Sequence, residues 1–285
     1  MRAETQVYNE AEIWIPEMLR KRTTVRGLEG VQEYKEEHPD KKTVIIASHT
    51  HNFDALIADD VFKKLYDVQL TGESVLKEDY RRYPGQAIMI NLLLREAFSP
   101  ISYKENERGK HGVFRPDDFT AISEEMDQGK TPWLALNSFS PEGKLTKAGV
   151  GGLYLALKND AAVIPAALNA IGGDASMENT SLALKNLLTK GDLKGLANIA
   201  KDIKSLFSQK YEYNIGQPLE LEPYDLSGFD AYFAKRKAGE APTDAERQAF
   251  RDGHAYLREL ADSLGYKIAG LLTNDRRGVY GQEAT

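Results

Sequence analysis

Residues 43–54 read TVIIASHTHNFD, and the rest of the chain is arranged around them. The β-branched apolar run at 44–47 predicts a buried strand with polar residues on either side. Asp54 then begins a helix-like run, and its carboxylate suits the N-cap, where it accepts free helix N–H groups. His49 and Asp54 therefore bracket a strand-to-helix turn at the carboxyl end of a strand, where α/β proteins bind ligands. An imidazole can exchange protons near neutral pH, and a nearby carboxylate can fix its tautomer.

The composition is that of an ordinary globular protein. The 285 residues are 41% hydrophobic and 28% charged, enough for one large α/β core or for a core with a helical subdomain. The lack of cysteine excludes disulfides, a thiolate nucleophile and Cys-ligated metal, and a net charge of −6 argues against a nucleic-acid partner. With no signal-peptide pattern and no run of about 18 apolar residues, we expect a cytoplasmic protein, soluble or peripheral on the inner membrane surface.

Strand and helix signals alternate between residues 43 and 168. Such alternation predicts an α/β fold, a largely parallel (mixed) sheet flanked by helices, with extra N-terminal and C-terminal helices. After the first strand, the expected elements are helices over 54–66, 86–96, 116–128 and 151–157, and strands over 97–103, 132–137, 161–168 and, at a sheet edge, 211–215.

The domain boundaries follow from a change in the pattern of apolar and charged residues along the chain. We expect an N-terminal helical segment over 1–42, an α/β domain over 43–225 with a helical insertion at 178–210, and C-terminal helices over 226–285 that pack on the same domain. The lysine-rich helices at 181–207 can dock on anionic lipid, and an ordinary solvated face explains the same pattern. His254 falls on the apolar stripe of the last helix, which predicts a core position.

The two histidines of the turn raise the question of a metal site. His49 and His51 form an HxH pair of the kind that metallohydrolases use, but a catalytic metal needs about three protein ligands. The chain has five histidines, and the other three lack ligand-like partners in sequence. A metal is therefore not expected, and a metal-dependent hydrolase centred on His49 and His51 is the alternative. A nucleophile elbow, a Walker A loop and a G-x-G-x-x-G fingerprint do not occur.

Four blocks of the chain carry a family resemblance. His49 and Asp54 stand in an HxxxxD spacing, and SPISYK at 99–104, FSPEGK at 139–144 and VIPA at 163–166 follow it. In this order the blocks resemble those of the glycerolipid (phospholipid/glycerol) acyltransferase superfamily, including its F-P-E-G-[TS]-R and V-I-P-V blocks. In lacking membrane segments the chain is most similar to the soluble glycerol-3-phosphate and 1-acylglycerol-3-phosphate acyltransferases.

The resemblance implies an O-acyltransferase of phospholipid biosynthesis. A fatty acyl group would pass from acyl-CoA or acyl-carrier protein to a hydroxyl of glycerol 3-phosphate or of a lysophospholipid-like acceptor. His49 would act as general base and Asp54 would orient it, with no metal or cofactor besides the acyl donor as co-substrate. The implied substrate-binding residues are Tyr103, Lys104, Arg108, Pro141, Glu142, Gly143, Lys144 and Lys147.

This chain departs from the family pattern at its basic positions. Tyr103 or Lys104 replaces the arginine of the second block, and Lys144 and Leu145 stand where the third block has a hydroxyl residue or an arginine. His51 replaces a small hydroxyl residue. Lysine keeps the charge but lacks the bidentate fork of arginine, which leaves the identity of the acceptor open. A lipid-binding member of the fold without catalytic activity is a further alternative.

Overall fold

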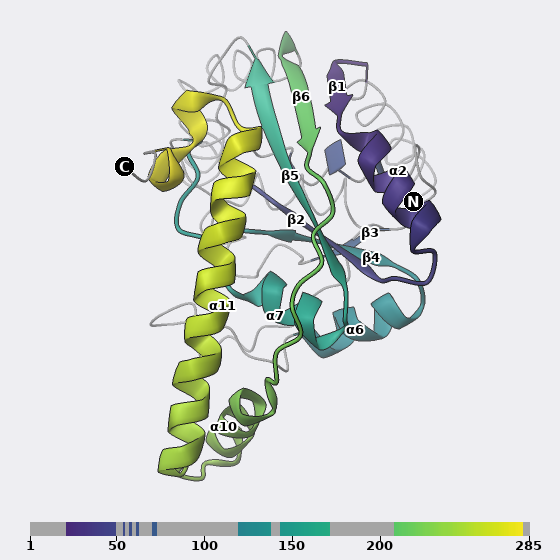
Figure 1. Cartoon of the computed structure of the whole chain (residues 1–285). Coiled ribbons are helices and arrows are strands. Elements are labelled where there is room, and N and C mark those ends of the chain that lie inside the picture. The colour runs from purple at the N-terminus through teal and green to yellow at the C-terminus, as the bar shows by residue number, and fades with distance from the viewer. Residues whose placement is uncertain are drawn as a thin grey trace, which may run out of the picture.

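The computed structural model of the chain contains a central sheet with helices packed on it (Figure 1). The expected helix at 86–96, the strand at 97–103 and the lysine-rich helices at 181–207 lie outside the residues that the structure describes. No helix in the described part combines the length and the apolar character needed to cross a bilayer. The described residues are 21–49, 54, 57–58, 61–62, 70–72, 119–137, 143–171 and 208–281.

Within those residues the sheet has six strands in the order β1-β6-β5-β2-β4-β3. The four strands from β5 to β3 are parallel neighbours, β6 is antiparallel to β5, and β1 is parallel to β6. The expected α/β fold with a largely parallel, mixed sheet is thereby confirmed. The strands are β1 (Thr23–Arg26), β2 (Thr43–Ala47), β3 (Leu70–Gly72), β4 (Thr131–Ala135), β5 (Ala162–Ile171) and β6 (Lys210–Ile215).

Both faces of the sheet are covered, so β2 is apolar at every central position. Alternate residues of a strand point to opposite faces. Val44 and Ile46 pack into one core with α6 (Thr120–Asp127), α7 (Gly151–Lys158) and α11 (Asp244–Leu271). Ile45 and Ala47 pack into the other core, with α2 (Leu28–Glu37) and the helical residues Ile57, Ala58, Val61 and Phe62.

Three local expectations differ from the structure. Segment 1–42 is not only helical, because Thr23–Arg26 forms an edge strand paired with β6. His254 is exposed rather than in the core, and its ring lies 5.9 Å from that of Phe250. Asp54 has helical backbone, so it lies within its helix rather than at the N-cap before it. The division into the segments 1–42, 43–225 and 226–285 stays a prediction.

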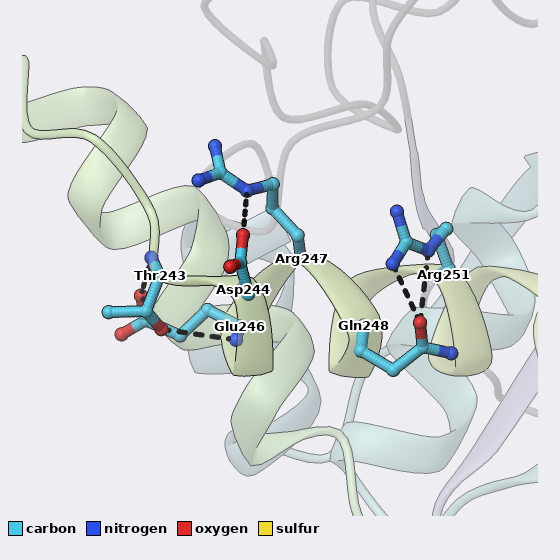
Figure 2. A network of polar contacts seen from close by, with 6 residues as sticks. All are labelled: Thr243, Asp244, Glu246, Arg247, Gln248 and Arg251. Atoms are coloured by element: carbon cyan, nitrogen blue, oxygen red, sulfur yellow. Dashed lines mark hydrogen bonds and ion pairs between the residues drawn. The ribbon is translucent and has the colours of Figure 1, made fainter.

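The N-terminus of α11 is closed by a capping box (Figure 2). The Thr243 hydroxyl accepts from the Glu246 backbone N–H at 3.3 Å, and the Glu246 carboxylate accepts from the Thr243 N–H at 2.7 Å. The two side chains satisfy helix N–H groups that have no partner within the helix. This cap fixes the start of the 28-residue helix that reaches from α10 (Ser227–Ala238) to the C-terminal residues.

The cap predicts a pH-dependent contribution of Glu246 to stability. The hydrogen bond from Lys235, and then those from Thr243, lower the pKa of Glu246 from 4.5 to about 2. A lowered carboxyl pKa stabilises the fold above the unfolded-state value and loses this effect as the pH falls through the folded-state value. Glu246→Gln should therefore unfold at a lower temperature than the natural chain at pH 7, with the gap closing between pH 4.5 and 2. Thermal unfolding across this range measures the gap, Glu259→Gln on the same helix is the control, and a pH-independent gap contradicts the prediction.

Candidate functional site

His49 and Asp54 lie in direct contact. The Nδ1 atom of His49 is 3.2 Å from the Oδ2 atom of Asp54. The Asp54 side chain is 1% exposed and the His49 side chain 29%. Because a carboxylate accepts hydrogen bonds and cannot donate them, we assign the proton to Nδ1, which leaves the lone pair on Nε2. The pair combines an oriented imidazole, reachable from solvent, with a buried carboxylate that can stabilise the imidazolium.

The strands on either side of β2 hold the backbone that carries His49. The Ser48 N–H donates to the Ala166 carbonyl of β5 at 3.0 Å. On the β4 side, the Leu136 N–H donates to the Ala47 carbonyl at 2.7 Å, and the His49 N–H donates to the Asn137 side-chain oxygen at 3.1 Å. His49 therefore leaves the sheet from a position fixed on both sides, which suits a catalytic side chain.

Asn137 is a site residue that the sequence analysis did not identify. It lies two residues after the end of β4, and the residue is 4% exposed. Its amide oxygen holds the His49 backbone across 88 residues of chain. The available signal was a polar residue at the carboxyl end of a strand, the same signal that identified His49. Nothing in the sequence, however, places β4 beside β2.

Two buried tyrosines of β6 lie close enough to Asp54 to experience its charge. Burial raises the pKa of Tyr211 and of Tyr213 above the ordinary value, and the negative charge of Asp54 raises it further. The Tyr211 hydroxyl donates to the Gln209 side-chain oxygen at 3.2 Å. Both hydroxyls therefore stay protonated at neutral pH and place no second negative charge beside Asp54.

Residues 143–149, here called the lysine loop, return to the carboxyl end of β4. The Gly149 N–H donates to the Leu136 carbonyl, next to the residue that holds His49. Leu145 and Ala148 are buried in the loop, whereas Lys144 and Lys147 are exposed. The loop thus presents two cations and ends near the carboxyl ends of β4 and β2, where His49 lies.

Of the remaining predicted residues, Gly143 is described by the structure and the others are not. Gly143, at the start of the lysine loop, has a φ of 66°, a left-handed backbone that favours glycine. The residues that lie outside the described part are His51, Tyr103, Lys104, Arg108, Pro141 and Glu142.

In the described part of the chain, no group of three or more His, Cys, Asp or Glu is arranged to hold a metal ion.

The chain shows distant structural similarity to a solved acyltransferase structure. No family model matches the sequence, and no curated protein matches it. Among solved structures, the 1-acyl-sn-glycerophosphate (LPA) acyltransferase PlsC from Thermotoga maritima is similar, with a TM-score of 0.39 and 11% sequence identity. The alignment covers 93% of this chain and 83% of that one. A likeness this distant assigns neither a substrate nor a catalytic residue.

Proposed function

We propose that this chain is an O-acyltransferase that moves a fatty acyl group from a thioester donor to the hydroxyl of a phosphorylated, glycerol-type acceptor. The donor would be acyl-CoA or acyl-carrier protein, and the acceptor glycerol 3-phosphate or a lysophospholipid-like molecule. The observation that carries the proposal is the contact between His49 and Asp54 at 3.2 Å, with one partner accessible and the other buried.

The proposed reaction uses His49 as a general base. Nε2 takes the proton of the acceptor hydroxyl as its oxygen attacks the thioester carbonyl carbon, and Asp54 stabilises the imidazolium that forms. The tetrahedral intermediate then collapses with loss of the C–S bond, and the imidazolium returns its proton to the departing thiolate. Backbone N–H groups near Gly143 are the proposed partners of the intermediate's oxyanion. The products are an ester and a free thiol, and the proposal requires no metal, cofactor or covalent enzyme intermediate.

The lysine loop supports the choice of a phosphorylated acceptor. Lys144 and Lys147 are exposed on a loop that is hydrogen-bonded to the carboxyl end of β4, beside the strand that carries His49. Lysine ammonium groups bind phosphate as point charges. Tyr103, Lys104, Arg108, Pro141 and Glu142 are proposed to complete this binding region.

A screen of donors against acceptors tests the proposal directly. The purified chain is given acyl-CoA or acyl-carrier protein with phosphorylated and unphosphorylated alcohols, and free thiol and ester are both measured. Ester formation that persists in the presence of a chelator supports the acyltransferase. Turnover lost with the chelator and restored by metal favours the hydrolase on His49 and His51, and lipid binding without turnover favours the non-catalytic alternative.

Loss of the Lys144 charge should weaken binding of the acceptor and leave binding of the acyl donor nearly unchanged. Lys144→Ala should raise the KM for a phosphorylated acceptor about 10- to 100-fold, the effect of losing a hydrogen bond to a charged group. The KM for the acyl donor should change little, and the difference should shrink as salt screens the exposed charge. Steady-state kinetics with each substrate varied in turn measures the effect. Lys237→Ala on the remote helix α10 is the matched control, and equal changes in both KM values would contradict the phosphate role.

A further inference from the structure

The last described residues of the chain pair with the lysine loop. Residues 273–281, here called the C-terminal hook, follow α11 and contain the short 3-10 turns η3 (Asn274–Arg276) and η4 (Gly278–Tyr280), yellow in Figure 1. The Leu145 N–H donates to the Arg276 carbonyl at 2.9 Å. The Leu145 carbonyl in turn accepts from the Val279 N–H at 3.2 Å. Both backbone groups of Leu145 are therefore bound to the hook.

Tyr280 makes the third connection between the hook and the lysine loop. Its hydroxyl accepts from the Ala148 N–H at 3.0 Å and donates to the Asp262 carboxylate at 2.9 Å. The ring lies against Gly265 of α11, where a Cβ atom would be 2.4 Å from a ring carbon. Tyr280 is 8% exposed, so it links the loop to α11 from a buried position.

Gly278 allows the hook to lie in close contact with the backbone of the lysine loop. Its φ is 56°, and a Cβ atom at this position would lie 1.9 Å from the Leu145 carbonyl oxygen. Any side chain here would have to displace the backbone of the lysine loop, and the left-handed conformation itself disfavours a side chain.

The start of the hook is anchored on the sheet. The Asn169 side chain of β5 donates to the Leu271 carbonyl at 2.9 Å and accepts from the Thr273 N–H at 3.0 Å. Asn214 of β6 donates to the same Leu271 carbonyl at 2.8 Å. The hook thus connects the neighbouring strands β5 and β6 to the loop that presents the lysines.

From these contacts we infer that the C-terminal hook, through Tyr280, positions Lys144 and Lys147 for a phosphate-bearing acceptor. Each lysine directly precedes a residue whose backbone N–H is bound by the hook, Leu145 or Ala148. Lysine side chains are flexible, so a fixed backbone limits the conformations that two such cations must lose when they bind one phosphate. Tyr280 is a positioning residue in this scheme, which rests on the proposed function for the identity of the ligand.

The test compares two substitutions that each remove one tyrosine hydroxyl. Tyr280→Phe removes two hydrogen bonds, of which the one from the Ala148 N–H holds the lysine loop. Loss of that bond should raise the KM for a phosphorylated acceptor about fivefold, with the donor KM unchanged. Gly278→Ala should raise the acceptor KM further. Tyr256→Phe, which removes a hydroxyl that donates to the Glu222 carbonyl at 2.9 Å, is the matched control on α11 and should change neither KM.

Two measurements without turnover separate this inference from the proposed function. Amide exchange at Leu145 and Ala148 should be faster in Tyr280→Phe, and a titration with inorganic phosphate, followed by the amide shifts of residues 144–148, should show weaker binding. The hook inference is wrong, and the function stands, if the natural chain turns over acceptor and Tyr280→Phe either leaves the acceptor KM unchanged or shifts both KM values equally.

If the natural chain shows no turnover, the proposed function is wrong. In that case weaker phosphate binding by Tyr280→Phe supports the hook, and equal or absent binding overturns it.

Discussion

His49→Ala should reduce thioester turnover by about 10²- to 10⁴-fold, the range expected when a general base is removed. The fold should persist, because the His49 side chain is partly exposed and its backbone N–H still donates to Asn137. Release of free thiol, followed with an aromatic disulfide reagent in the presence of acceptor, measures the loss. Circular dichroism and thermal unfolding of the variant report on its fold.

The chain offers a matched control for this substitution. His254 is exposed on α11, and His254→Ala removes an imidazole from outside the proposed site. This variant should retain the turnover of the natural chain. Undiminished turnover in His49→Ala would remove the assignment of His49 as the base, and an equal loss in both variants would point to a general effect on the protein.

Asp54→Asn should cause the second large loss, again about 10²- to 10⁴-fold in turnover. An amide of nearly the same shape fills the buried position but carries no charge to stabilise the imidazolium. Its NH₂ group can also donate to Nδ1, which then requires the proton on Nε2 and removes the lone pair needed for base catalysis.

The kinetic pattern distinguishes an electrostatic role of Asp54 from a structural one. If Asp54 acts on the imidazole, kcat falls while the KM of the donor and the melting temperature change little. Asp262→Asn is not a suitable control, since Asp262 holds Tyr280. Asp252→Asn, at an exposed position of α11, is suitable and should retain activity. An active Asp54→Asn enzyme would contradict the proposed dyad.

Several elements could be predicted because their signals are local. The expected strands at 132–137, 161–168 and 211–215 correspond to β4, β5 and β6, although β6 lies between β5 and β1 rather than at the sheet edge. The expected C-terminal helices over 226–285 correspond to α10 and α11. Each carries an apolar pattern that one face of an element must bury. The edge strand β1 was missed because Thr23–Arg26 is four residues long and half exposed, so its strand conformation depends on pairing with β6.

The misplacement of His254 has a different cause. The residue falls on the helical period of the apolar stripe and is exposed, whereas Gly253 beside it packs on Phe229 of α10 and Leu257, one turn later, is buried. Periodicity predicts which side of a helix is apolar, but it does not predict how far the neighbouring layer extends. The pattern was therefore read correctly, and the burial inferred from it was wrong.

By itself the sequence determined the buried strand at 43–47, the turn after it, and the nearness of His49 to Asp54, because five residues of chain keep the two within reach. Only the tertiary structure decided that Asn137 holds the His49 backbone from 88 residues away, and that Tyr280 holds the lysine loop from 132 residues away. The physical reason is that short-range conformation follows from neighbouring side chains. Contacts between distant residues depend instead on the order of the strands and on where α11 ends.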